Sequence, residues 1–259
     1  MLVHFSKYHG AGNDFIIIDN RQGVILNEDH TVIRGLCDRH LGIGADGLIL
    51  LTGHDEYDFE MNYFNADGLE GSFCGNGARC IASFAYGSGI AGKSMRFKAS
   101  DGVHIALVED NQIRVKMNDV ARLEKKEGFF FLDTGSPHAV FSRPDVKTMD
   151  AVGEGKKIRY SKSFEPAGTN VDFIQREGNT LFIRTYERGV ENETLSCGTG
   201  VVAAAICAVL DGTIDKTPVP VQTRGGKLEV DFTIIRDNRV TDIWLTGPVR
   251  FVFKGEIEI

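Results

Sequence analysis

The sequence predicts a mixed α/β (α+β) protein of two similar halves, in each of which a sheet wraps around a buried central helix. Three observations predict this fold. Short alternating or apolar segments bounded by turn residues recur along the chain, which is typical of strands. Two helical segments are apolar on nearly every face, as expected of helices that are buried all round. Each of these two helices follows a Cys-Gly-x-Gly sequence, so the arrangement occurs twice.

In the first half, strands are expected wherever apolar and polar residues alternate, or where a short apolar run lies between turns. A polar-rich helix is expected at 29–39, and the apolar helix ARCIASFAY at 78–86 ends in a Gly-Ser-Gly turn. The expected strands are FIIID (15–19), GLILL (47–51), YDFEMNYFN (57–65), MRFKAS (95–100) and HIALVEDNQIRVKM (104–117), the last a hairpin that turns at Glu109 to Gln112.

In the second half, the same pattern of strands surrounds the apolar helix VVAAAICAVL (201–210), which ends at the glycine of Asp211-Gly212. GNDFIII (12–18) has a counterpart in TNVDFIQ (169–175), so we interpret the chain as two halves joined near residue 119. There the segment MNDVARLEKKEG (117–128) is expected to be a charged connector. The expected strands are FFFLD (129–133), VDFIQREGNTLFIRTYE (171–187, a hairpin that turns at Gly178-Asn179), KLEVDF (227–232) and RFVFKGEIEI (250–259).

Composition excludes several classes of protein. A net charge of −7 over 259 residues argues against nucleic acid as a partner, because phosphate binding needs a cationic surface. The N-terminus lacks the pattern of a secretory signal, and the longest apolar run is too short to span a bilayer. We therefore expect a cytoplasmic protein with no membrane partner. The five cysteines are an odd number without a CxxC pair, which predicts neither a disulfide framework nor a structural metal site.

Two of the cysteines lie in matching settings. Cys74 precedes Gly75-Asn76-Gly77, and Cys197 precedes Gly198-Thr199-Gly200. Glycine lets the backbone approach a ligand closely, and the N–H groups at a helix start attract an anion and lower the pKa of a thiol placed there. A single cysteine near a helix is most often a small buried hydrophobe, but the duplicated setting indicates function. The ordinary interpretation is kept for Cys37, Cys80 and Cys207.

Two thiols in symmetric settings suit a reaction whose two directions are mirror images. One thiol removes a proton from one face of a carbon, and the other returns a proton to the opposite face, which is a racemisation or epimerisation. A nucleophilic cysteine enzyme needs one thiol and one base, so a second thiol would have no use. A thiol redox or metal-binding module is the alternative from another class.

NADGLEGSFCGNGARC (65–80) resembles the diaminopimelate epimerase family, as do GNDF (12–15), IGADG (43–47), GTNVDF (168–173) and RTYERGVENETLSCGTG (184–200). The resemblance covers nearly the whole chain. It implies two similar α/β domains, each a curved, mostly antiparallel or mixed sheet around a central helix, with the active site between them. It also implies that the C-terminal strand returns to the first domain. The expected domains are 1–118 with 249–259, and 119–248.

The resemblance implies a cofactor-independent epimerase that needs no pyridoxal phosphate. Its substrate would be a small molecule, with LL- and meso-2,6-diaminopimelate interconverted in lysine and peptidoglycan precursor synthesis. Cys74 and Cys197 match the family's acid/base pair, and a homodimer is possible. A proline or hydroxyproline racemase of the same fold is the nearest alternative, although it has no need to grip a second carboxylate.

Binding residues also follow from the resemblance. The guanidinium of Arg188, paired with Glu187, matches a grip on the distal carboxylate. His138 matches a histidine that tunes the pKa of a thiol, with Glu187 as a further supporting residue. Backbone N–H groups at the two helix starts would bind the α-carboxylate. In isolation, the asparagines fit turn positions as well as a binding site. Taken alone, Glu187 and Arg188 are more typical of an ordinary solvated pair, and His138 is more typical of a loop histidine. The expected substrate contacts are Asn13, Asn65, Asn170, Gly75, Asn76, Gly198, Thr199, Glu187 and Arg188.

Two positions depart from the family pattern. Some members carry glutamine at the position of Gly47 and asparagine at that of Ser136, so substrate contacts at these two positions are open. Asp14, Asp67 and Asp172 are expected to hold turns.

Overall fold

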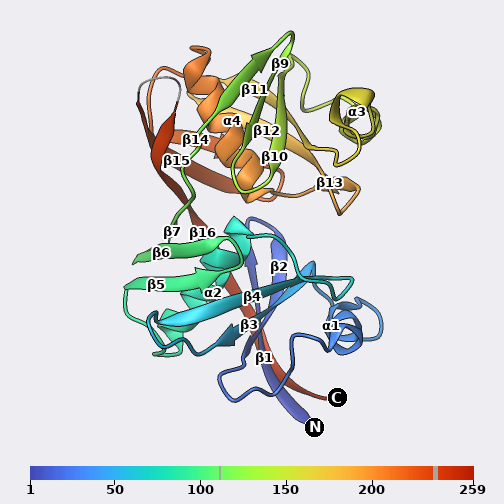
Figure 1. Cartoon of the computed structure of the whole chain (residues 1–259), viewed down its shortest axis with the longest axis vertical. Coiled ribbons are helices and arrows are strands. Elements are labelled where there is room, and N and C mark those ends of the chain that lie inside the picture. The colour runs from blue at the N-terminus through green and yellow to red at the C-terminus, as the bar shows by residue number, and fades with distance from the viewer. Residues whose placement is uncertain (111, 236–238) are drawn as a thin grey trace. The chain divides into compact units, whose positions relative to one another are not determined.

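The computed structural model describes residues 1–110, 112–235 and 239–259, so Asn111 of the expected hairpin turn lies outside the described residues. The chain forms two compact units, Met1–Val115 with Gly247–Ile259, and Lys116–Thr246. Each unit contains a mixed sheet whose strands contact one central helix (Figure 1). The predicted mixed α/β fold with two similar halves is confirmed.

The first unit contains a sheet in the order β1-β2-β3-β4-β5-β6-β7. β2 runs parallel to β3 and β4 runs parallel to β5, whereas β1/β2, β3/β4, β5/β6 and β6/β7 are antiparallel pairs. The strands are β1 (Leu2–Gly10), β2 (Asn13–Asp19), β3 (Gly47–Thr52), β4 (Phe59–Asn65), β5 (Ser94–Ala99), β6 (Gly102–Glu109) and β7 (Gln112–Lys116).

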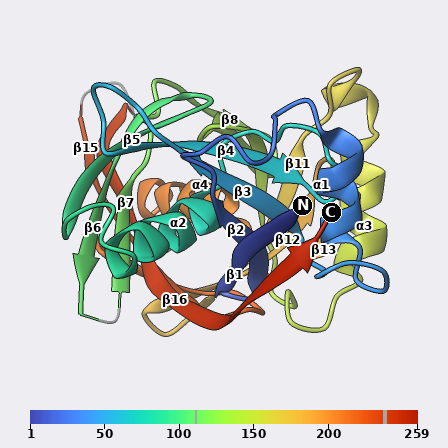
Figure 2. The ribbon, with the colours of Figure 1, turned by 90° about the horizontal axis from the view of Figure 1, so that it is seen from below.

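The C-terminal end of the chain belongs to the first unit. The long strand β16 (Val240–Glu258) pairs antiparallel with β1, from Leu2 opposite Glu258 to Gly10 opposite Val249. The two chain ends meet there, where the Ile259 N–H donates to the Met1 carbonyl at 2.9 Å (Figure 2). The C-terminal strand therefore returns to the first unit, as the family resemblance implied.

The second unit repeats the same pattern of strand directions. Its sheet runs β8-β9-β10-β11-β12-β14-β15-β16, with β13 beside β12, and β10/β11 and β12/β14 are the parallel pairs. The strands are β8 (Leu123–Lys126), β9 (Phe129–Asp133), β10 (Pro137–Ser142), β11 (Asn170–Glu177), β12 (Thr180–Glu187), β13 (Asn192–Thr194), β14 (Val219–Gln222) and β15 (Lys227–Ile234).

Strand order corrects the alignment of the two halves. In each unit a helix separates the first parallel pair along the chain, so β2 corresponds to β10, and β3 corresponds to β11. The sequence pairing of 12–18 with 169–175 is therefore wrong, because it matches β2 with β11. The true counterpart of GNDF is the loop and strand start GSPH at 135–138. Both segments contain an Asp-Phe pair, but this pair does not indicate which strands of the two units correspond.

The central helices are α2 (Gly75–Gly87) and α4 (Gly198–Leu210). Every residue of α4 from Gly198 to Ala208 is buried, and α2 is buried over most of its length. Both helices begin three residues before the predicted starts, because each cysteine serves as the N-cap and the glycines lie in the first turn. Gly212 has a φ of 78° just after α4, which confirms the predicted glycine at the helix end.

Each sheet is also covered on its other face by a second helix. In β3, Leu48 and Leu50 belong to a core cluster with Ile33 of α1 (His30–Cys37), whereas Ile49 points toward α2. Burial on both faces explains why β3 is a continuous apolar run. In the second unit, α3 (Ala151–Arg159) packs its Ala151 against β10, β11 and β12, and a short 3-10 helix follows at Lys162–Phe164.

α1 confirms the helix predicted at 29–39, whereas α3 was not predicted because two glycines interrupt its apolar spacing.

The expected charged connector is wrong in part, since it contains β8. Gly128, with a φ of 84°, turns β8 into β9. Among the described strands, β8 with its Lys125 and Lys126 pairs with β9 alone. No helix in the described ranges is long and apolar enough to cross a membrane.

Candidate active site

Cys74 caps the first central helix. Its Sγ accepts a hydrogen bond from the Gly77 N–H at 3.4 Å and lies 3.7 Å from the Asn13 Oδ1. The Cys74 side chain is partly exposed, whereas Cys80, six residues further along the chain in α2, is fully buried. The two cysteines of this helix therefore have different environments: one belongs to a polar network, and the other belongs to the core.

The helix that Cys74 caps contains a buried arginine. Arg79 is fully buried and donates to the Asn76 Oδ1 at 2.6 Å and to the Gly75 carbonyl at 3.2 Å. Burial lowers the pKa of Arg79 to about 10, so the guanidinium is still charged at neutral pH. The Asn76 Nδ2 donates in turn to the Asn13 Oδ1 at 3.2 Å. A buried cation thus contacts the first turn of α2, and the sequence did not indicate it because Arg79 lies in an apolar helix.

Asn13 is held by partners within its own unit. Its Oδ1 receives the Asn76 amide, and its Nδ2 donates to the Asp46 Oδ2 at 2.8 Å. The neighbouring Asp14 pairs with Lys7 at 2.6 Å and Arg39 at 2.8 Å. Burial acts to raise the pKa of Asp14, but the hydrogen bonds from Arg39 and Lys7 outweigh it and lower the pKa to about 2. The expectation that Asp14 holds a turn is wrong, because it anchors β2 through ion pairs.

Asn65 ends β4 and is exposed. Its Oδ1 accepts a hydrogen bond from the Tyr63 hydroxyl at 3.2 Å, and its backbone N–H donates to the Leu69 carbonyl. Asp67 accepts the Leu69 N–H at 2.9 Å, so this aspartate does hold a turn as predicted. Of the three expected asparagines, Asn65 is the most exposed.

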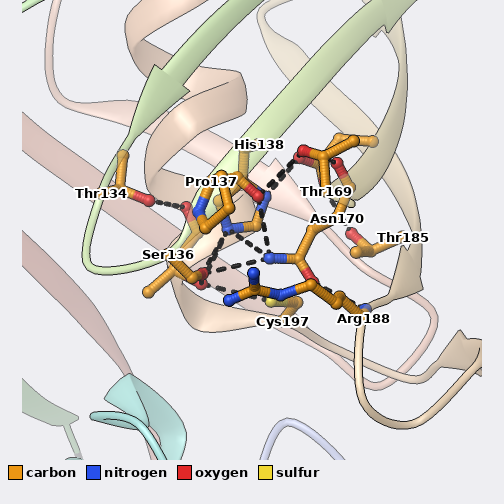
Figure 3. A network of polar contacts seen from close by, with 11 residues as sticks. Thr134, Ser136, Pro137, His138, Thr169, Asn170, Thr185, Arg188 and Cys197 are labelled. Atoms are coloured by element: carbon orange, nitrogen blue, oxygen red, sulfur yellow. Dashed lines mark hydrogen bonds and ion pairs between the residues drawn. The ribbon is translucent and has the colours of Figure 1, made fainter. Parts of the chain in front are cut away.

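In the second unit, Cys197 caps α4 and begins a buried chain of hydrogen bonds. Its Sγ lies 3.4 Å from the Thr199 Oγ1, which lies 2.9 Å from the His138 Nε2. The His138 Nδ1 lies 2.7 Å from the Asp172 Oδ2. Figure 3 shows His138 between Thr169, Asn170 and Ser136, with Cys197 at the edge of this network. Each of the four residues in the chain is buried.

The carboxylate of Asp172 fixes the direction of the hydrogen bond at one end of this chain. A carboxylate only accepts, so the His138 Nδ1 donates to Asp172. The Thr199 hydroxyl lies within hydrogen-bond distance of both His138 and Cys197, and the Ser136 hydroxyl lies 3.1 Å from the His138 Nε2 and 3.2 Å from the Thr199 Oγ1. Either hydroxyl can therefore donate to His138. The hydrogen bond of Thr199 lowers the pKa of Cys197, so it favours the thiolate.

The surroundings of Cys197 as a whole favour its thiol form. Burial, followed by the negative charges of Glu187 and Asp172, raises the pKa of Cys197 well above its usual value, against smaller opposing effects of Thr199 and Gly200. The expectation that the helix start lowers the pKa of this thiol is wrong for the protein alone. Desolvation and two nearby carboxylates outweigh the helix N–H groups.

Asp172 is a functional candidate, and the prediction that it holds a turn is wrong. It lies buried in β11, not in a turn, and its Oδ1 accepts a hydrogen bond from the Thr185 hydroxyl at 2.7 Å. A Cβ added to Gly200 would come within 2.6 Å of that same Oδ1. The second glycine of the CGTG motif thus makes room for Asp172. The sequence had indicated instead that this glycine lets the backbone approach a ligand.

Asn170 links His138 to the arginine expected to bind substrate. Its Nδ2 donates to the Ser136 Oγ at 3.1 Å and to the Pro137 carbonyl at 3.0 Å, and its Oδ1 accepts the Arg188 backbone N–H at 2.8 Å. Ser136 also contacts the His138 Nε2 at 3.1 Å. The serine therefore joins the network around His138, and Asn170 fixes the backbone that carries Arg188.

Buried thiols predict a loss of stability at alkaline pH. Burial raises the pKa of Cys207, and of Cys37 to about 12, whereas an unfolded thiol ionises near about 8.5. Above that pH the unfolded chain has released protons that the folded chain still binds, so the free energy of unfolding falls as pH rises. Each such thiol contributes up to roughly 1.4 kcal/mol per pH unit.

Cys207→Ala is expected to reduce this alkaline loss, as measured by urea unfolding at neutral and alkaline pH. Val202→Ala, in the same buried helix, is the matched control, because it removes volume but no titrating group. It should lower stability by the same amount at both pH values. An unchanged alkaline loss in Cys207→Ala would contradict the prediction.

The family model of diaminopimelate epimerase matches residues 5–123 and 130–252. A diaminopimelate epimerase of Flavobacterium psychrophilum is 44% identical over 254 residues, which cover 97% of this chain and 98% of that protein. A diaminopimelate epimerase of Chlorobaculum tepidum is 43% identical over 261 residues, with 96% of this chain and 99% of that protein covered.

Solved structures with low sequence identity share the fold. A phenazine biosynthesis protein of the PhzF family from Bacillus anthracis superposes with a TM-score of 0.78 at 14% identity, covering 100% of both chains. A hydroxyproline epimerase from Agrobacterium vitis superposes with a TM-score of 0.72 at 13% identity, covering 99% of this chain and 92% of that one. At such identities the likeness concerns the fold alone.

Proposed function

Because this chain belongs to the diaminopimelate epimerase family and is therefore an isomerase, we propose that Cys74 and Cys197 exchange protons with one α-carbon of diaminopimelate. This interconverts the LL- and meso-isomers, a step of lysine biosynthesis in the cytoplasm. Each half, 1–118 with 249–259 and 119–248, supplies one thiol. The observation that carries the proposal is that both cysteines cap a central helix within a polar network.

The two thiols enter the reaction in different states. Cys197 begins as the acid, because burial and the negative charges of Glu187 and Asp172 oppose a negative sulfur. Cys74 begins as the base, supported by the buried charge of Arg79 in the helix that Cys74 caps. After one turnover the states are exchanged, and the opposite isomer becomes the substrate. His138 acts on Cys197 through Thr199 in this scheme.

Removal of an α-proton leaves an electron pair that the adjacent carboxylate must share. The N–H groups at the starts of α2 and α4 would bind that carboxylate, with Gly75 and Asn76 on one helix and Gly198 and Thr199 on the other. Donors of this kind are worth about 3 to 4 kcal/mol each when they meet charge that develops in the transition state. They take the place of an electron-withdrawing cofactor, and no cofactor is included in the proposal.

Arg188 is proposed to bind the distal carboxylate. Its guanidinium has no carboxylate partner in the described part of the chain, whereas Arg159 and Arg184 pair with Glu191 and Glu193. The Asn170 amide fixes its backbone. A partly buried guanidinium that is left available fits a carboxylate through two parallel hydrogen bonds. Asn13, Asn65 and Asn170 complete the proposed set that holds and orients the substrate.

The test is exchange in heavy water followed by proton NMR. The purified protein is incubated with LL-diaminopimelate and, separately, with proline. We expect the meso-isomer to form with deuterium at the inverted α-carbon, and no reaction of proline. Exchange and inversion of proline without reaction of diaminopimelate would overturn the proposal in favour of a proline-type racemase. Inactivity toward both, with zinc or a stable disulfide in the protein, would favour a metal-binding or redox module.

A further inference from the structure

Tyr63, in β4, lies in a slot between two glycines. A Cβ added to Gly71 would come within 2.4 Å of the Tyr63 Cε1, and one added to Gly47 would come within 2.6 Å of its Cε2. The two edges of one ring thus press against two residues that have no side chain. Phe15 closes the slot, with its ring centroid 5.9 Å away in an edge-on arrangement.

The backbone does not explain these two glycines. Neither Gly47 nor Gly71 is among the residues with a positive φ, so each has a backbone conformation open to other residues. Gly47 also lies close to the Phe64 carbonyl, but Gly71 is crowded mainly by the Tyr63 ring. The close approach of the phenol is therefore the reason for glycine at position 71 and one of two reasons at position 47.

The hydroxyl of this seated ring points to a residue of the candidate site. It donates to the Asn65 Oδ1 at 3.2 Å. An amide oxygen that accepts from Tyr63 fixes which end of the amide faces outward, because the Nδ2 group lies on the opposite side. The exposed end of Asn65 is therefore a pair of N–H donors, which suits a carboxylate or another anionic oxygen.

We infer that Tyr63 is a positioning residue that holds the Asn65 amide with its N–H groups toward a carboxylate of the substrate. The inference rests on the proposed function, since it assigns Asn65 to substrate binding. The phenol reaches this place because Gly47 and Gly71 lack side chains. Gly47 thus contributes to the site through the tyrosine seated on it and not through a contact of its own.

The test compares steady-state kinetics of Tyr63→Phe with those of the unmodified protein. Loss of the hydroxyl leaves Asn65 free to rotate, so KM for LL-diaminopimelate should rise about 5- to 10-fold while kcat changes less than about 2-fold. In an Asn65→Ala background, Tyr63→Phe should have no further effect on KM. Tyr86→Phe, an exposed tyrosine on α2, is the control and should keep both constants.

Gly71→Ala provides a second variant that keeps the hydroxyl but displaces the ring, and it should raise KM in the same way. A normal KM in Tyr63→Phe, or an equal rise in KM with and without Asn65, would overturn the inference. A purely structural role would instead lower the melting temperature and leave KM unchanged. Absence of turnover in the unmodified protein would overturn the proposed function, and this inference with it.

Discussion

Replacing Cys197 with alanine is expected to abolish epimerisation, with a loss of about 10³-fold or more, because inversion needs a proton donor on the face opposite the base. The remaining thiol, Cys74, can still remove and return a proton on its own face. Cys197→Ala should therefore exchange the α-hydrogen of one isomer with solvent deuterium without inverting it. Proton NMR of LL- and meso-diaminopimelate incubated separately in heavy water measures both events.

The mirror variant should show the opposite preference and a different pH dependence. Cys74→Ala leaves Cys197 as the only base, so it should exchange only the isomer that Cys197→Ala leaves untouched. Because the pKa of Cys197 is raised, its thiolate fraction grows as pH rises through the alkaline range. Exchange by Cys74→Ala should therefore increase with pH over that range.

Each helix supplies its own control for these two variants. Cys80 lies in α2 and Cys207 lies in α4, and both are buried in the core. Cys80→Ala and Cys207→Ala should keep epimerisation within a few-fold of the unmodified protein, once their loss of stability is allowed for. Full turnover in Cys197→Ala, or exchange of both isomers by each single variant, would contradict the two-base proposal.

The two central helices could be predicted because their signal is local. An apolar run that fills every face of a helix leaves no side for water, and a glycine shortly after it marks the end. The strands on either side follow from alternation in the same way. The Cys-Gly-x-Gly motifs could be assigned a helix start because caps and glycines act on their immediate neighbours.

The buried charged residues near each thiol could not be predicted from these local sequence patterns. Asp172 approaches Cys197 only because β10 and β11 pair in parallel, with His138 opposite Asn170. Its burial beside Gly200 depends on the packing of α4 on that sheet. Arg79 resembles an ordinary helix residue until the core closes around it. The contacts of Asp172 join residues far apart in sequence, and the raised pKa of Cys197 results first from burial and then from the charges of Glu187 and Asp172.

Replacing Arg188 with methionine is expected to lower kcat/KM for LL-diaminopimelate by about 10²- to 10³-fold, since two charged hydrogen bonds of about 1.5 to 3 kcal/mol each are lost in part. Lysine as a substrate tests the assignment, because it has the same chain and distal amine but no distal carboxylate. The unmodified protein should discriminate strongly against lysine. Arg188→Met should lose most of that discrimination.

The comparison of two proteins with two substrates separates a specific contact from general damage. If Arg188 binds the distal carboxylate, its removal affects diaminopimelate and leaves the slow exchange of the lysine α-hydrogen nearly unchanged. Arg176→Gln is the matched control, because Arg176 lies in the same unit and donates to the Gly178 and Thr213 carbonyls. An equal loss with both substrates would place Arg188 at the α-carboxylate or in the structure alone. Restoration by Arg188→Lys should be partial, because an ammonium offers the carboxylate a point charge and not a bidentate fork.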